Sequence, residues 1–315
     1  MTSRLGSLLV LTEDQGNDAH ATVTEVVKRM LRLAVPGYQT HRLNFEPRDK
    51  EAQQAIRGAR WKSTDARDQQ ALTELFRTIT TRLLRGDGFV FFHVDGDRPW
   101  SQRETSENVA KFTEIVRARV HQNMLYARRS PEEAERHLQR LFLIAPFYSI
   151  EAWAYQNTEV AVRLCNALHQ GRDVERFEAW KLDRAALDEV VNPKKETCLR
   201  AGHNLELVGA GYPADEVFNA ERSYGQCVLD LLNSVELMEL LEKTKVLLIY
   251  RMDRSCSSRG PAREGERGKR PAMRRMSAAW GCWGKRRRKR WARPRASSCW
   301  PRRSIERMAT TSRSA

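Results

Sequence analysis

Short apolar runs alternate with amphipathic helical patterns, and this alternation constrains the fold of the 315-residue chain more than any other feature. The strand-like runs are residues 6–13, 38–45, 89–92 and 141–146. Between them, apolar residues recur at the three- and four-residue spacings of a helix face, in residues 23–34, 72–83 and 109–116. Such an order predicts an α/β fold, with a mainly parallel sheet and helices on both faces.

A further helix is predicted before the fourth strand. Ser130 is expected as its N-cap, with Pro131 at the first helical position and Glu133 completing a capping box. Residues 149–168 and most of 171–250 also have helical patterns. We therefore expect an α/β domain over residues 1–170, a mostly helical extension packed on it over 171–250, and a separate tail over 251–315.

The cluster Asp95-Gly96-Asp97 directly follows the third apolar run. Asp-Gly between apolar residues is a strong hairpin signal. A hairpin needs a returning apolar strand, yet the next residues are polar and are interrupted by Pro99. We therefore interpret the cluster as the end of a strand and not as a hairpin turn.

Acidic residues follow three of the four expected strands. They are Glu13 after the first, Asp95 and Asp97 after the third, and Glu151 after the fourth. Ligands of open α/β sheets gather at the carboxyl ends of the strands. Carboxylates converging there repel one another unless a cation lies among them, and hard oxygen donors favour Mg²⁺ or Mn²⁺. Any one of these acids alone is equally typical of a helix N-cap or dipole partner.

His93 precedes Asp95 by two residues, so both side chains are expected on the same face of the strand. A histidine in an apolar strand is either a further metal ligand or a packed residue hydrogen-bonded to a neighbour. We favour the packed interpretation.

The ordered set of acids resembles the Toprim fold of topoisomerases, primases and the overcoming-lysogenization-defect nucleases. The stretches SIEAWAYQN (149–157) and NPKKETC (192–198) are similar to Toprim-like proteins of unknown function. The resemblance covers roughly residues 5–240. It implies Mg²⁺-dependent phosphoryl transfer, most simply by a nuclease acting on nucleic acid, with a separate ATPase partner in a bacterial defence setting.

The resemblance also implies roles for individual residues. Glu13 would be the catalytic glutamate, Asp95 and Asp97 the Mg²⁺ ligands, and Glu151 a further ligand. Lys194 or Lys195 would contact a phosphate, although a solvated lysine pair is the simpler interpretation. In the family a glycine directly follows the glutamate, whereas here Asp14 and Gln15 precede Gly16, so Asp14 or Asp18 could share the role of Glu13.

Two other functions remain open at this point. A sugar-nucleotide transferase would use Asp95 and Asp97 to chelate Mn²⁺ under a diphosphate, but it would leave Glu13 without a role. A non-catalytic interaction module would need none of these acids.

The formal net charge of +15 is unevenly distributed. Residues 251–315 contain 21 Lys+Arg and 4 Asp+Glu, a net of +17, whereas residues 1–250 have a net of −2. The tail has four of the eight Trp but no Leu, Val, Phe or Tyr, so it cannot bury enough apolar surface to fold. We expect disorder and favour a frameshifted, non-native C-terminus over an evolved basic arm.

Cys165, Cys198 and Cys227 are far apart in sequence and form no C-x-x-C motif. We interpret them as buried thiols, not as metal ligands or disulfides. Neither a signal peptide nor a run of membrane-spanning length is visible. These features favour a reduced, cytoplasmic protein.

Overall fold

A computed structural model describes residues 4–14, 16–56, 61 and 63–256, with side chains described except at residues 17 and 246–256. These residues all belong to one compact unit. Disorder and a non-native sequence were expected over residues 251–315. Residues 251–256 instead form the end of a helix, and the residues from 257 onward lie outside the described part of the chain.

The described residues contain a four-stranded sheet of order β2-β1-β3-β4. Its strands are β1 (Gly6–Thr12), β2 (Leu43–Phe45), β3 (Gly88–His93) and β4 (Leu141–Ile144). Every pairing is parallel, which confirms the predicted α/β class. Because β3 pairs in parallel with both of its neighbours, the chain does not form a hairpin at Asp95-Gly96-Asp97.

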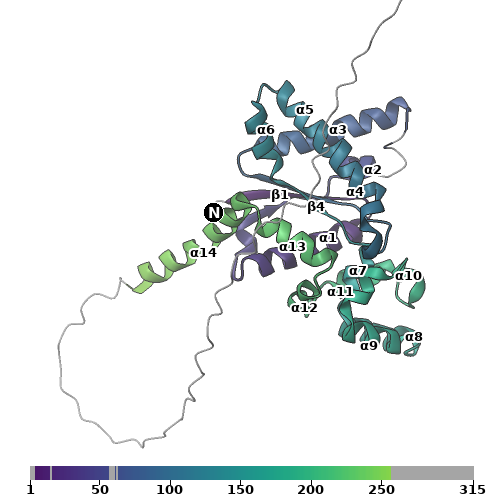
Figure 1. Cartoon of the computed structure of the whole chain (residues 1–315). Coiled ribbons are helices and arrows are strands. Elements are labelled where there is room, and N and C mark those ends of the chain that lie inside the picture. The colour runs from purple at the N-terminus through teal and green to yellow at the C-terminus, as the bar shows by residue number, and fades with distance from the viewer. Residues whose placement is uncertain (1–3, 15, 57–60, 62, 257–315) are drawn as a thin grey trace, which may run out of the picture. The chain divides into compact units, whose positions relative to one another are not determined.

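Helices cover both faces of the sheet, as Figure 1 shows. One face is covered by α2 (Lys50–Ile56), α3 (Ala66–Leu84), α4 (Glu107–Lys111), a π-helical turn η4 (Phe112–Arg117), α5 (Ala118–Tyr126) and α6 (Pro131–Leu138). Alternate strand residues such as Leu9, Leu11 and Val90 join the core on this side. We call it the α3 face.

The opposite face, here the α1 face, is covered by α1 (Asn17–Ala34) and by helices that follow β4. Those helices are α7 (Glu151–Ala154), α8 (Thr158–His169), α9 (Val174–Leu182), α10 (Pro193–Glu196), α11 (Asn204–Leu207), α12 (Ala214–Asn219), α13 (Ser223–Leu232) and α14 (Val235–Cys256). Short 3-10 turns are η1 (Thr40–Arg42), η3 (Trp100–Thr105), η5 (Arg184–Glu189) and η6 (Ala201–His203).

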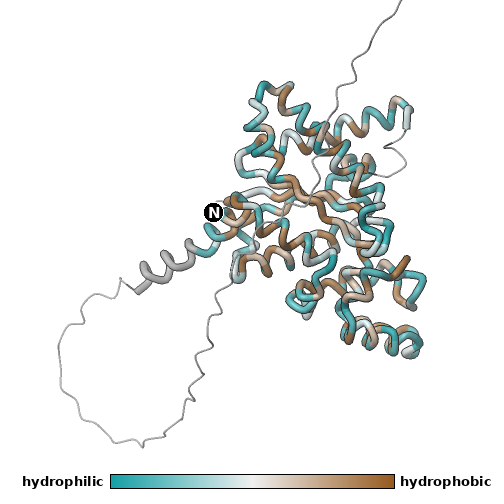
Figure 2. The backbone as a smooth tube through the Cα atoms, viewed as in Figure 1, coloured by the Kyte–Doolittle hydropathy of each residue, from teal (hydrophilic) through white to brown (hydrophobic). Residues whose placement is uncertain are grey.

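The core on the α1 face extends across the boundary expected at residues 170 and 171. Phe91 of β3, Leu164 of α8, Phe177 of α9 and Val228 of α13 all belong to it. Figure 2 shows hydrophobic residues concentrated along the strands and on helix sides that face them. The helical extension therefore shares a core with the sheet.

Several elements differ from the sequence-based expectation. Residues 38–45 were predicted as one strand, but residues 40–42 form a 3-10 turn and only Leu43–Phe45 pair with β1. In the polar stretch 46–68, where the sequence has no clear periodicity, α2 forms and buries Ala52, Ala55 and Ile56 against the sheet. The capping box of Ser130 and Glu133 is present as predicted.

No helix within the described ranges has both the length and the apolar character needed to cross a membrane.

Candidate active site

The candidate site lies where β1 and β3 end side by side. Thr12 is in register with His93, and the next backbone amide, that of Glu13, donates to the His93 carbonyl over 3.1 Å. Parallel pairing thus brings the acids after β1 beside those after β3, as the strand-end argument predicted.

Asp95 lies at the centre of this edge. Its amide donates to Glu13 Oε2 over 3.2 Å, and its own Oδ1 accepts from the Ile150 amide over 3.1 Å. Burial raises the pKa of Asp95 well above its usual value, and the charges of Asp14, Glu13 and Glu151 raise it further, while Lys194 lowers it. Asp95 is therefore surrounded by carboxylates without a fully compensating cation.

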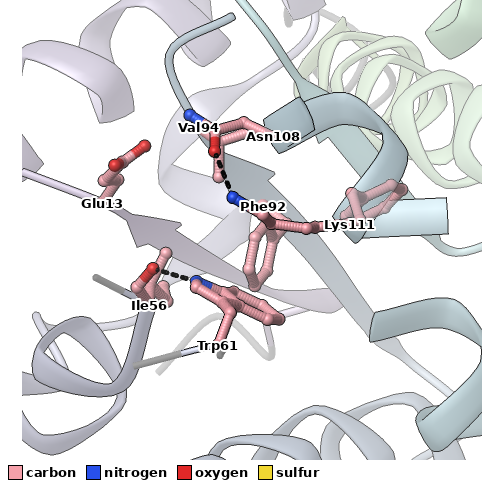
Figure 3. Close-up of a pocket in the computed structure, with 8 residues that line it drawn as sticks. Glu13, Ile56, Trp61, Phe92, Val94, Asn108 and Lys111 are labelled. Carbon is pink, nitrogen blue, oxygen red and sulfur yellow. Dashed lines mark hydrogen bonds between the residues drawn. The ribbon is translucent and has the colours of Figure 1, made fainter. Parts of the chain in front are cut away.

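Glu13 continues the strand alternation onto the α3 face. It lines a small pocket of about 10 Å³ with Trp61, Asn108 and Lys111, no larger than a water molecule needs. In Figure 3 Glu13 lies across this pocket from Asn108 and Lys111. Burial raises the pKa of Glu13 to about 7. The charges of Asp97 and Asp14 also raise it, whereas the hydrogen bond from the Asp95 amide lowers it.

Asp14 lies on the other side of the edge. With Asp18, Glu151, Lys194 and Asn204 it lines a second pocket, of about 440 Å³. Because successive side chains of an extended chain point to opposite faces, Glu13 and Asp14 lie on either side of Asp95. Asp14 and Asp18, which the sequence offered as residues that could share the role of Glu13, line the larger pocket, whereas Glu13 lines the smaller one.

Glu151 begins α7 and is fully buried. Lys194 Nζ lies 3.0 Å from its Oε1, and Asn204 donates to the same oxygen over 2.7 Å. The Ser149 hydroxyl donates to Oε2 over 2.7 Å. The Glu151 carboxylate is thus held by protein groups on both oxygens.

The two lysines singled out by the sequence differ. Lys194 pairs with Glu151 and reaches the larger pocket, whereas Lys195 is exposed. Burial lowers the pKa of Lys194, but the charge and hydrogen bond of Glu151, with Asp14 and Asp95, outweigh it, so the net pKa is raised. Lys194 is therefore a fixed positive charge at the pocket wall.

Asp97 is exposed and adopts a left-handed backbone conformation, with φ of 53°. Asn108 of α4 donates from Nδ2 to both Asp97 Oδ2 and the Asp95 carbonyl, each over 2.9 Å. Asn108 thus fixes the turn that contains both aspartates. Nothing in the sequence pattern marked Asn108, because its partners lie more than ten residues away across a turn.

His93 is completely buried, and its Nδ1 lies 3.1 Å from the Thr12 hydroxyl, in agreement with the packed interpretation. Its Nε2 is 3.5 Å from Asp95 Oδ1 and has no hydrogen bond. Burial lowers the pKa of His93 to about 4, although the charges of Asp14 and Glu151 oppose this. The imidazole is therefore neutral at physiological pH.

The predicted acids are neighbours but not a compact ligand cage. Among the described residues, the group of three or more carboxylate, imidazole or thiol donor atoms within 4.8 Å of one another is Cys165, Asp173 and Cys198. Glu13, Asp95, Asp97 and Glu151 do not form such a group. The first two are linked through a backbone amide, and Glu151 is engaged by Lys194.

Comparisons with protein-family models, with curated proteins and with solved structures found no match to this chain.

Proposed function

We propose that this chain is a divalent-metal-dependent phosphoryl-transfer protein, most simply a Toprim-like nuclease. The observation that carries the proposal is the contact between Glu13 Oε2 and the Asp95 amide, which brings two partly buried acidic residues together at adjoining strand ends. Asp14 flanks Asp95 from the side of the larger pocket. This is the arrangement in which a cation would offset mutual repulsion.

The donor set fits Mg²⁺ or Mn²⁺. The available groups are carboxylate oxygens, with no thiol facing either pocket in the described part of the chain. Burial is the largest cause of the raised pKa of Asp95 and of Glu13, and neighbouring carboxylates raise both further, while Lys194 beside Asp95 and Lys111 beside Glu13 offset only part of the increase. The donor atoms of Asp95, Glu13 and Asp14 do not form a group within 4.8 Å of one another, so to hold one ion the flanking carboxylates of Glu13 and Asp14 would have to turn toward Asp95, with Asp97 as an outer ligand. When bound, the metal would stabilise negative charge on phosphate oxygens.

The larger pocket has features that suit a phosphoester. Gly16, Asp18 and Ala19 place the first turn of the 18-residue helix α1 in its wall, and no side chain caps that helix end. Free amide groups at a helix N-terminus favour anions. Lys194 adds a positive charge to this pocket. In the smaller pocket, on the other side of the strand edge, a Glu13 carboxyl with a pKa of about 7 can hold or accept a proton near neutral pH.

The test is cleavage of plasmid and single-stranded DNA and of RNA by the full chain, with Mg²⁺ or Mn²⁺ and with a chelator. We expect metal-dependent cleavage that falls on the order of 100-fold in Asp95→Asn and in Glu13→Gln. Asp87→Asn is the matched control, because Asp87 is an exposed aspartate at the opposite end of β3. Asp14→Asn shows whether the second face of the edge contributes.

Cleavage that is unchanged in both Asp95→Asn and Glu13→Gln would sink the proposal. Release of a nucleoside diphosphate from a sugar nucleotide, lost in Asp95→Asn but not in Glu13→Gln, would instead favour a transferase.

A further inference from the structure

Two cysteines that are 33 residues apart in sequence meet in the core on the α1 face. Cys165 Sγ of α8 and Cys198 Sγ, which follows α10, are 3.1 Å apart, and both residues are buried free thiols. The sequence predicted that both residues are buried thiols, and the structure confirms this. Their spacing in the sequence did not indicate that the two sulfurs lie in contact. Cys227, the third described free thiol, is not part of this group.

Asp173 completes a three-donor cluster at the N-terminus of α9. Its Oδ2 accepts from the Cys198 amide over 2.6 Å, and its own amide lies 3.4 Å from Cys165 Sγ as a donor. An N–H group directed at sulfur stabilises a thiolate. Three side chains from three segments are thus oriented toward one point and tied together by backbone hydrogen bonds.

We propose that Cys165, Cys198 and Asp173 bind a zinc ion. Two thiolates and one carboxylate form a borderline-soft donor set that favours zinc over magnesium or calcium. Donor atoms within 4.8 Å of one another can surround a single ion with bonds of about 2.0 to 2.3 Å. The site differs in chemistry from the acidic strand edge, and it does not depend on the function proposed for that edge.

Proton and charge balance are consistent with zinc. Binding would release one proton from each thiol, giving two thiolates and one carboxylate around a divalent ion, a net charge of −1. Arg172 Nε lies 3.6 Å from Asp173 Oδ2 and would offset this charge. The Asp173 side chain is 18% exposed, so an ion can enter from solvent although both sulfurs are buried.

His169 is near the cluster in sequence, but its ring nitrogens are not part of the group of donor atoms that lie within 4.8 Å of one another. It lies one helical turn after Cys165 on α8, on the same side of the helix, and its Nε2 is buried without a hydrogen-bond partner. Such an orphaned nitrogen is unfavourable unless it is engaged, and imidazole is a common zinc ligand. The His169 ring would therefore have to turn toward the ion to complete a tetrahedral set with the two sulfurs and one oxygen, and otherwise water would take the fourth position.

The site would fix the segment that carries Lys194. Cys198 lies two residues after the end of α10, and α10 presents Lys194 to Glu151 at the wall of the larger pocket. A bond from zinc to Cys198 would therefore anchor this segment to α8 and α9.

The experiment uses the full chain with Cys256, Cys282 and Cys299 replaced by serine, so that the three core thiols are the remaining ones. The protein is purified reduced, stripped with a chelator and titrated with Co²⁺ and then Zn²⁺. We expect one equivalent of Co²⁺ to give a thiolate-to-cobalt charge-transfer band and visible bands of tetrahedral Co²⁺, both abolished by Zn²⁺. Oxygen-only binding at the acidic edge would give no charge-transfer band.

Cys165→Ser and Cys198→Ser should weaken zinc binding by more than the roughly 10- to 100-fold typical of losing a supporting residue. Cys227→Ser is the matched control and should bind as the parent does. Asp173→Asn preserves an acceptor for the Cys198 amide and tests the third ligand if a cysteine variant does not fold. Circular dichroism of the metal-free proteins identifies any such failure.

Reduced, folded protein without a charge-transfer band, or an equally strong band in Cys198→Ser, overturns the proposal. Loss of the band in Cys165→Ser and Cys198→Ser, together with its retention in Cys227→Ser, supports it.

Discussion

Asp188 shows how a single buried acid can control stability away from the candidate site. It lies in η5, is 2% exposed and accepts from both the amide and the hydroxyl of Ser223, over 2.9 and 2.6 Å. Trp153 donates to the same hydroxyl over 2.7 Å. Burial raises the pKa of Asp188 to about 7, although the two hydrogen bonds from Ser223 and the charge of Arg222 lower it.

This pKa predicts a pH dependence of stability. The folded state holds the Asp188 proton more tightly than the unfolded chain does. The free energy of unfolding that this proton contributes is therefore complete below the unfolded pKa of 3.8 and is lost as pH rises to about 7. Asp188→Asn should remove a slope of up to about 1.4 kcal/mol per pH unit in that window. Urea unfolding of both proteins from pH 4 to 7 measures it. A parent-minus-variant difference that is constant with pH would contradict the assignment.

The ion pair of the buried Glu151 with Lys194, whose side chain is 41% exposed, gives a second prediction at this scale. Lys194→Met leaves the carboxylate with hydrogen bonds from Ser149 and Asn204 but no counter-charge, and should destabilise the protein by about 1–3 kcal/mol. The double variant Glu151→Gln/Lys194→Met should be more stable than Lys194→Met alone, because no charge is left buried. Additive free energies in this double-mutant cycle would show that the pair is not coupled.

Among the elements, β3 depends on a close approach at its first residue. A Cβ at Gly88 would overlap the Arg82 carbonyl oxygen at the end of α3, whereas a Cβ at Gly86 meets nothing within 4 Å. Gly88→Ala should therefore destabilise the protein by about 1–3 kcal/mol or more. Gly86→Ala, two residues earlier, should change stability by less than about 1 kcal/mol. Equal melting temperatures for the two variants would contradict this packing.

The sequence predicted elements best where burial is continuous. All six residues of β3 are buried, so its apolar run was unambiguous, and the periodic α1 and α3 formed as expected. Residues 38–45 were misassigned because alternation alone does not distinguish a strand from a turn that precedes a shorter strand. The sequence did not distinguish the short α2 from a loop, because seven residues provide too little periodicity.

The candidate site was predictable only in part. The approach of the acids after β1 to those after β3 follows from parallel pairing. That Glu13 and Asp14 lie on opposite faces follows from strand alternation, which also fixes which pocket each one meets. The contacts of Lys194 and Asn204 with Glu151 depend on how later helices fold back, which no local pattern specifies.

At the scale of the whole molecule, charge and folded core are separated along the sequence. Residues 251–315 carry a net charge of +17, whereas Leu241 is the last core residue among those whose side chains the structure describes. A chain ending at Cys256 should therefore keep its thermal transition and any metal-dependent cleavage. It should bind DNA more weakly, and its DNA-binding constant should fall less steeply as the salt concentration rises. Each phosphate that the protein neutralises adds about 0.9 to the slope of the logarithm of the binding constant against the logarithm of the salt concentration. Binding titrations at several salt concentrations, for both chain lengths, measure this. An unchanged slope would place the DNA-binding residues within 1–256.

The packing of α14 against the start of the sheet also bears on biosynthesis. Leu240 lies against Gly6 at the beginning of β1, and the Thr244 hydroxyl accepts from the Gln39 amide over 3.0 Å. The ribosome releases β1 first, yet the surface around Gly6 stays uncovered until α14 has left the exit tunnel. Nascent chains stalled before residue 240 should therefore expose apolar surface that the finished protein hides, and they are the species that chaperones would recognise.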